Sequence, residues 1–301
     1  MSTLIDDLQQ RAQAGDPEAQ FELDRCYASG GGVAGDLAEA ARCFQRAAEQ
    51  GHAQAQVRLA NMYATGQGVE QDDHRAVELY RRAADAGEAA AAACLGAAYL
   101  GGTGVKEDPA EGVRWLTVAA EGGAADAQMV LGLLHAAGEW VEQDPKAAFK
   151  WLRRAAEQGN AMAQYHLATR YHEGVRVKED ELKAARWFRA AAEQGHADAQ
   201  FRLGCLLAHG KVVSRDQVEA VQWYRKAAEQ GVAQAHARLA LCCLKGEGTA
   251  KDCVEAFKWA KLAEADEPAM AELCSQLAER MPAEDVQRAE GLARQWRPRR
   301  E

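Results

Sequence analysis

Aromatic residues, proline and positive charge are scarce in this chain of 301 residues. Aromatics make up 7% of the sequence and prolines number six. Lysine and arginine total 36 against 45 acidic residues, so the formal net charge is −9. Such a chain repels phosphate backbones unless its basic groups are segregated, and we expect no nucleic-acid partner. Few β-branched runs and abundant alanine predict an all-α protein that packs through small residues.

Long apolar runs and recognisable cysteine motifs are also missing. The opening Met1 to Asp7 lacks a basic end followed by an apolar stretch. No apolar run approaches the roughly 20 residues that span a bilayer, so we expect no membrane insertion and a cytoplasmic location. The eight cysteines include no C-x-x-C, and the adjacent Cys242 and Cys243 are poorly placed for an ordinary disulfide. We interpret the cysteines mostly as small buried hydrophobic residues that stay reduced.

The sequence repeats itself every 36 residues between residues 15 and 266, in seven copies without insertions. Each copy is counted from an opening glycine at position 0. The opening glycines are Gly15, Gly51, Gly87, Gly123, Gly159, Gly195 and Gly231. All seven copies have Ala at position 4, Leu at 8, Gly at 15, Asp at 21 and Ala at 32.

Each invariant position has a role in a helical hairpin. Ala and Leu at positions 4 and 8 share one face of a first helix, which glycine at position 15 ends in a left-handed conformation. Asp at position 21 begins a second helix as its N-cap, and Pro109 and Pro145 follow two of these aspartates. The glutamates three residues after the cap predict capping boxes. They are Glu39, Glu111, Glu219 and Glu255.

A single hairpin cannot bury its own apolar stripe, so the hairpins must stack into an α-solenoid. We expect one solenoid domain over residues 1–301, with an N-terminal capping helix at 1–14 and seven repeats at 15–266. Two closing helices, at 269–280 and 283–296, then form a C-terminal cap at 267–296, and residues 297–301 form a frayed tail.

The motif as it stands in repeat 2 resembles the Sel-1-like repeat family, relatives of tetratricopeptide repeats, and the resemblance covers residues 15–266. The matching residues are Ala55, Leu59, Tyr63, Gly66, Gly68, Val69, Asp72, Ala76, Tyr80, Ala83, Ala84 and Gly87. The resemblance implies a right-handed superhelix whose first helices line a concave surface. It also implies scaffold or adaptor roles in complex assembly and signalling.

Positions 7, 10 and 14 of the first helix lie opposite the core-facing residues and are expected on that concave wall. They are apolar in the middle repeats and carry Arg, His and Lys in the flanking ones, which predicts a groove for a peptide or protein with acidic flanks around an apolar anchor. The candidate residues are Arg58, Asn61, Val130, Leu133, His166, Arg202, His209, Arg238 and Lys245. The alternative is a solvated wall in which Val130 and Leu133 merely touch the neighbouring repeat.

The loop between the two helices changes in the middle repeats. Position 17 is glycine in repeats 1, 2, 3 and 7 but Trp140, Arg176 and Val212 in repeats 4 to 6, so those loops are expected to follow another backbone path. Trp140 is a further candidate contact for a partner. The alternative is that its side chain folds back over its own hairpin.

Catalytic and metal-binding patterns are not found. The eight histidines form no H-E-x-x-H or i, i+4 pair, the paired loop glycines follow no strand, and no two acids are visibly paired. We therefore expect no cofactor, no metal and no enzymatic activity. The resemblance offers one alternative, β-lactam binding or hydrolysis as in a cysteine-rich branch of the family. This chain lacks that branch's regular cysteine pairs and any Ser-x-x-Lys motif.

Overall fold

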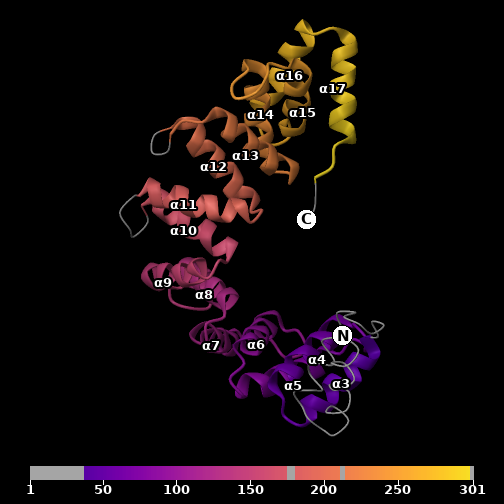
Figure 1. The fold of residues 1–301 in the computed structure, drawn as a ribbon, viewed down its shortest axis with the longest axis vertical. Helices are drawn as coiled ribbons and strands as arrows, with labels where there is room; N and C mark the ends of the chain where they lie inside the picture. The colour runs from indigo at the N-terminus through magenta and orange to yellow at the C-terminus, as the bar shows by residue number, and fades with distance from the viewer. Residues whose placement is uncertain (1–36, 175–179, 211–213, 299–301) are drawn as a thin grey trace, which may run out of the picture. The chain divides into compact units, whose positions relative to one another are not determined.

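The computed structural model describes residues 37–174, 180–210 and 214–298, and within these ranges it contains fifteen helices and no strand (Figure 1). The prediction of an all-α chain is confirmed. The first helices of the repeats are α4 (Ala53–Thr65), α6 (Ala89–Gly101), α8 (Ala125–Ala137), α10 (Ala161–Glu173), α12 (Ala197–His209) and α14 (Ala233–Lys245). The second helices are α3 (Leu37–Glu49), α5 (Asp73–Asp85), α7 (Pro109–Glu121), α9 (Pro145–Glu157), α11 (Glu181–Glu193), α13 (Gln217–Glu229) and α15 (Cys253–Ala263). Helices α16 (Pro268–Arg280) and α17 (Ala283–Gln295) follow the last repeat.

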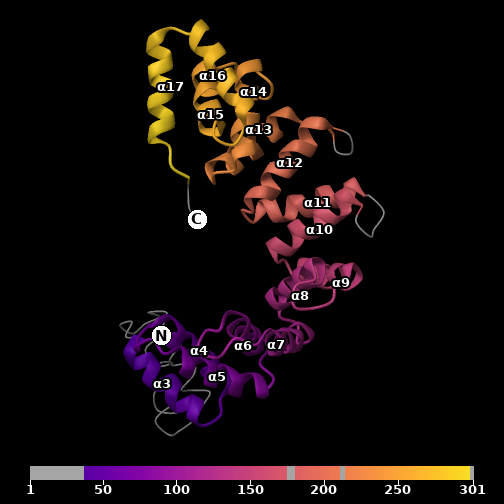
Figure 2. The same ribbon diagram turned by 180° about the vertical axis from the view of Figure 1, so that it is seen from behind.

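The chain divides into two compact units, residues 1–155 and 156–301. Within each unit a second helix packs between the first helix of its own repeat and that of the next (Figure 2). The expected helix within residues 1–14 and the first helix of repeat 1 lie outside the described residues. The assignment of residues 1–14 and 267–296 as caps of a single domain, and of residues 297–301 as a tail, stays a prediction.

Small residues allow the two helices of a repeat to approach closely. In the six described first helices, Ala at position 4 and Leu at position 8 are never more than 3% exposed, which confirms the core-facing stripe. Where position 9 is glycine, the neighbouring helix leaves no room for a side chain. A Cβ atom on Gly96 would lie 2.8 Å from Leu116 Cγ, and one on Gly204 would lie 2.7 Å from a Tyr224 ring carbon. Burial of each leucine contributes roughly 1.5–3 kcal/mol to the core.

The predicted helix ends are largely confirmed. In repeats 2 to 7, glycines at position 15 end the first helices with φ between 65° and 75°, and the aspartates at position 21 cap the second helices. Asp108 Oδ1, for example, accepts the backbone N–H of Glu111 at 3.1 Å. The backbone N–H of the capping aspartate itself has a different acceptor from the glutamate that we expected.

The predicted capping boxes at Glu111, Glu219 and Glu255 are wrong, and the one at Glu39 stays a prediction. The N-cap N–H donates to a carbonyl at the end of the first helix instead, as from Asp108 N to Tyr99 O at 3.0 Å. Glu111 is therefore available to accept the indole N–H of Trp115 at 3.0 Å, and Glu219 accepts that of Trp223 at 3.1 Å. The side chain of Glu39 lies outside the described residues, and Glu255 pairs with Lys258.

Trp140 keeps the local backbone conformation of the glycine loops, so the expected change of path does not arise from φ at this position. Its φ is 57°, in the same left-handed region as Gly104 (φ 65°) at the equivalent place one repeat earlier. A Cβ atom on Gly104 would lie 2.1 Å from Asp73 O, so the glycine loop touches the preceding repeat. Because Trp140 has a Cβ atom, its loop cannot approach that closely. The other two non-glycine positions, Arg176 and Val212, lie outside the described residues.

Candidate functional site

The first-helix surface of the first unit begins with Arg58 and Asn61 on α4. The Arg58 side chain is exposed, whereas Asn61 is half-buried and its Oδ1 accepts the hydroxyl of Tyr80 at 2.6 Å. Asn61 therefore ties the two helices of repeat 2 together. A pocket of about 280 Å³ in this unit is lined by Tyr63, Arg82 and their neighbours, and by neither candidate.

Val130 and Leu133 lie on α8, and both are half-buried. Val130 packs against the core cluster that contains Leu131, so it touches the interior as the solvated-wall alternative requires. Leu133 has no such contact with that cluster and keeps part of its side chain at the surface. Of the two predicted apolar anchors, Leu133 is therefore the better placed to meet a partner.

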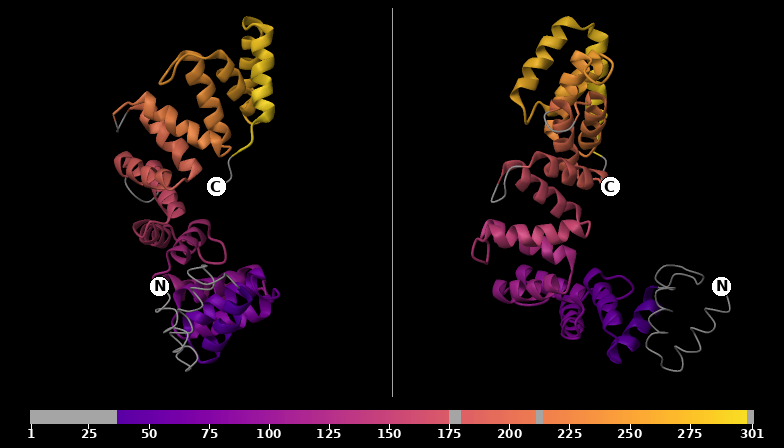
Figure 3. Two further views of the ribbon diagram at one scale, coloured as in Figure 1. Left: turned by 45° about the vertical axis from the view of Figure 1, so that its right-hand side comes forward. Right: turned by 60° about the vertical axis from the view of Figure 1, so that its left-hand side comes forward.

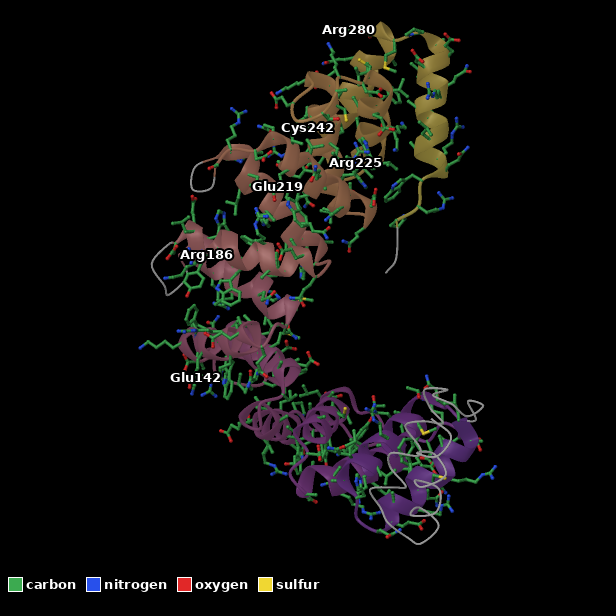
Figure 4. All side chains as sticks on the ribbon, in the orientation of Figure 1. Glu142, Arg186, Glu219, Arg225, Cys242 and Arg280 are labelled. Atoms are coloured by element: carbon green, nitrogen blue, oxygen red, sulfur yellow. The ribbon has the colours of Figure 1, made fainter. Side chains whose placement is uncertain are left out.

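Trp140 presents its indole on the loop between α8 and α9, where the side chain is 47% exposed. Its backbone is in a region that costs a non-glycine residue on the order of 1–3 kcal/mol. A large apolar ring that is both exposed and held in a strained conformation is a candidate contact residue. The labelled Glu142 in Figure 4 marks the same loop.

In the second unit His166 lies on α10 and Arg202 on α12. His166 is half-buried, with its ring edge against Tyr165 at a centroid distance of 5.3 Å. Burial lowers the pKa of His166, and the nearby His196 and Arg170 lower it further. His166 is therefore a neutral packing group rather than a cation, whereas Arg202 is exposed.

The structure brings three of the candidate residues together. His209, Arg238 and Lys245 line one pocket of about 170 Å³ between α12 and α14. The apolar part of its wall includes Leu241, and all three basic side chains are exposed. His209 is held by an Nδ1 contact of 2.7 Å to a backbone carbonyl one turn earlier in α12. Arg238 and Lys245 bring positive charge to a small apolar floor, and Glu247 adds one carboxylate to the lining.

The same pocket contains two weak acids, Tyr224 and Cys242. Burial raises the pKa of the Cys242 thiol to about 11, and burial also raises the pKa of the Tyr224 phenol. Both groups are therefore protonated at neutral pH, and neither is an activated nucleophile. The pocket has chemistry for binding an anionic or apolar group, with no group poised to react.

The described cysteines are all free. Cys43, Cys242, Cys243 and Cys274 are buried as interpreted, whereas Cys94, Cys205 and Cys253 are only half-buried. Cys26 lies outside the described residues. Among the residues that the structure describes, no three His, Cys, Asp or Glu side chains gather closely enough to hold a metal ion.

Sequence reasoning missed a series of buried glutamines at position 5 of the first helix. Each donates its Nε2 to the carbonyl of an alanine in the preceding second helix, at 2.9 to 3.2 Å. The glutamines are Gln56, Gln128, Gln164 and Gln200, and repeat 7 has His236 at the same position. Their regular recurrence was the available signal, since a polar residue on a buried face needs a partner.

Stacked helical hairpins of constant length define a helical repeat protein, and the chain belongs to the Sel1 repeat family. The Sel1 repeat model matches seven segments, residues 17–52, 53–88, 89–123, 125–160, 161–196, 197–232 and 233–265. Each segment begins two residues after the glycine that opens the repeat. The resemblance inferred from repeat 2 is confirmed.

Two solved structures are similar over most of the chain. A Sel1 repeat protein from Oxalobacter formigenes is 34% identical, with 77% of this chain and 97% of that one covered and a TM-score of 0.65. A protective antigen of uropathogenic Escherichia coli that displays an SLR fold is 30% identical, with 97% of this chain and 71% of that one covered and a TM-score of 0.63. No curated protein matches the chain. The alternative of β-lactam binding or hydrolysis finds no support in these comparisons.

The part of the chain that the structure describes holds no helix with both the length and the apolar character to cross a membrane.

Proposed function

We propose that this chain is a non-enzymatic protein-interaction scaffold that binds a peptide or protein partner on the face of its first helices. The family supports a binding function in general terms. The observation that carries the finer proposal is the pocket at which His209, Arg238 and Lys245 surround Leu241. Such a site suits a partner segment with acidic residues next to an apolar side chain.

The other candidate residues are proposed as contacts within their own unit. Arg58, Leu133 and Trp140 are accessible in the first unit, and Arg202 is accessible in the second. A role as an adaptor in complex assembly or signalling, and a cytoplasmic location, belong to the same proposal.

A charge reversal tests the basic pocket. The double variant Arg238→Glu with Lys245→Glu should lose partners that the wild-type chain captures from a cell extract, and the loss should be smaller at high salt, where screening already weakens the contact. The matched control is Arg186→Glu with Arg225→Glu, two exposed arginines on the second helices α11 and α13 that Figure 4 labels. Equal capture by wild type and both variants would contradict the proposal.

Leu133→Asp tests the apolar anchor in the first unit. If Leu133 enters a partner, the substitution should weaken binding of a captured partner by about 2 kcal/mol, measured by titration calorimetry. The helical content should not change, because the side chain is only half-buried. Unaltered affinity in a folded variant would leave Leu133 as part of a solvated wall.

A further inference from the structure

The chain folds its own C-terminal segment onto repeat 7. After α17, the Trp296 ring meets the ring of His236 edge-on, with centroids 5.0 Å apart and planes at 89°. Two residues later, Pro298 reaches Gly231, where an added Cβ atom would lie 3.5 Å from Pro298 Cβ. Figure 3 shows the chain leaving the end of α17 toward the orange helices. Residues 296–298 thus cover the start of α14.

One repeat earlier, the equivalent place is an open pocket of about 460 Å³. Gly195 and Gln200, which line it, lie 36 residues before Gly231 and His236. The internal bond is equivalent as well. Gln200 Nε2 donates to Ala192 O at 3.2 Å, and His236 Nε2 lies 3.0 Å from the matching carbonyl 36 residues later, Ala228 O. The two places therefore share one backbone framework, and only the one in repeat 7 is covered by the C-terminal segment.

Gln230 explains why the buried side chain at position 5 is covered by different groups in repeats 6 and 7. Its Nε2 donates to Gly195 O at 2.8 Å and to Gln200 Oε1 at 3.0 Å. The corresponding residue of repeat 7 is Asp266, whose carboxylate has no hydrogen to donate. In repeat 7 the ring of Trp296 covers the buried side chain instead.

The open pocket is complementary in charge to the segment that fills its counterpart. Glu193 and Glu229 line it, and its one basic side chain, Lys226, lies over the Trp223 ring at 4.1 Å. The C-terminal ends of α11 and α13 add partial negative charge from their carbonyl groups. The C-terminal sequence around Trp296 is basic, with arginines at 294, 297, 299 and 300.

We propose that this pocket of repeat 6 binds an extended partner segment in which an aromatic residue is followed by basic residues and a proline. The chain's own Trp296-Arg297-Pro298 is an intramolecular instance of that segment, seated in repeat 7. The pocket differs in place and in charge from the basic pocket around Arg238, so the two proposals stand or fall separately. The unit of residues 156–301 would then bind two types of ligand, one at each pocket.

The probe is a fluorescein-labelled peptide with the sequence of residues 293–300, titrated into the full chain and followed by fluorescence anisotropy. We expect one bound peptide per chain. A peptide with Ala in place of its tryptophan should bind about tenfold more weakly or worse, because the aromatic ring supplies most of the buried contact. No binding, or equal binding of the two peptides, would overturn the proposal.

Variants of the chain locate the site. Glu193→Lys should weaken peptide binding several-fold, most strongly at low salt, and the neutral variant Glu193→Gln should have a smaller effect. Both changes are at an exposed residue and should leave the fold intact. Asp85→Lys reverses the charge at the equivalent exposed position of repeat 2, where Ala92 stands in place of the buried glutamine, and should bind as wild type does. Equal weakening by Glu193→Lys and Asp85→Lys would mean unspecific charge attraction and would refute the site.

Removal of the internal segment gives a second readout. Trp296→Ala should open the counterpart in repeat 7 and raise the stoichiometry from one to two peptides per chain, measured by calorimetry. A variant that binds one peptide where wild type binds none would restrict this chemistry to repeat 7 and overturn the proposal for repeat 6. A dimer of the wild-type chain that Trp296→Ala abolishes would identify the occupant as a second copy and equally contradict a partner segment.

Discussion

The contact between a loop and the preceding repeat is tested by two alanine substitutions in one loop. Gly102 and Gly104 share a φ of 65°, so Ala suffers the same backbone strain at either position. Their surroundings differ. A Cβ atom on Gly102 would lie 3.4 Å from its nearest neighbour, Glu107 Cβ, whereas one on Gly104 would lie 2.1 Å from Asp73 O at the start of α5. The pair separates conformational strain from the close approach between repeats.

The loss of stability expected for each variant follows from backbone strain and from the close approach of the preceding repeat. A left-handed conformation costs an L-residue about 1–2 kcal/mol, which is the full effect expected for Gly102→Ala. Gly104→Ala adds the cost of moving the loop away from a backbone oxygen. Overpacking of this kind costs about 1–3 kcal/mol, so the total for Gly104→Ala is about 2–5 kcal/mol.

Urea denaturation of the full chain, followed by circular dichroism, measures the global effect. Since repeat arrays lose structure in parts, amide hydrogen exchange of α5, α6 and α7 should locate it. Exchange should accelerate in these helices more in Gly104→Ala than in Gly102→Ala. If the two variants lose the same stability, the loop does not support the stacking of repeats 2 and 3, and the reasoning is refuted.

Three further predictions concern caps and titration. Asp108→Ala should destabilise the first unit by about 1 kcal/mol in thermal denaturation, with Asn at this position restoring most of the loss; an inert substitution would contradict the capping role. Burial lowers the pKa of His236, so below about pH 6.5 the unfolded chain takes up the proton first and stability falls as the pH drops. His236→Gln should reduce this slope in denaturation between pH 5 and 7 without removing it, because His166 and His196 also have lowered pKa values, and an unchanged slope would count against the assignment. With its raised pKa, Cys242 should react with iodoacetamide at pH 8 far more slowly in the folded than in the denatured chain, as mass spectrometry can show; equal rates would contradict its burial.

The helices and their ends were predictable because they depend on chemistry within a few residues. Ala and Leu spacing, the cap at Asp108 and the terminating glycines act inside one hairpin, and seven copies of the pattern removed ambiguity about its period. The prediction of capping boxes failed because it, too, considered only a few neighbouring residues. A glutamate three residues after an aspartate does not reveal that the backbone N–H it would meet is already bonded to Tyr99, or that Trp115 needs an acceptor.

The candidate site was predictable only in part, because it depends on contacts between repeats. Helical geometry was enough to place Arg238 and Lys245 on one face, but their association with His209 in a pocket required the neighbouring helix. Asn61 was expected on an open wall, and its bond to Tyr80 joins residues 19 positions apart. The pocket at Gln200 was not predicted, since its walls come from three successive helices and its acceptor is a backbone carbonyl.

The sequence separation between hydrogen-bonded residues determines whether the number of repeats can change without loss of these bonds. The longest joins Gln230 to Gly195, 35 residues apart, one less than the repeat. Excision or duplication of one complete unit at a repeat boundary therefore offers each donor the equivalent acceptor of a neighbouring unit. Recombination between the copies in such a gene would lengthen or shorten the chain in steps of 36 residues without breaking this bonding pattern. The segment around Trp296 can cover the last repeat of an array of any length, provided that this repeat carries a residue like His236 beneath the tryptophan.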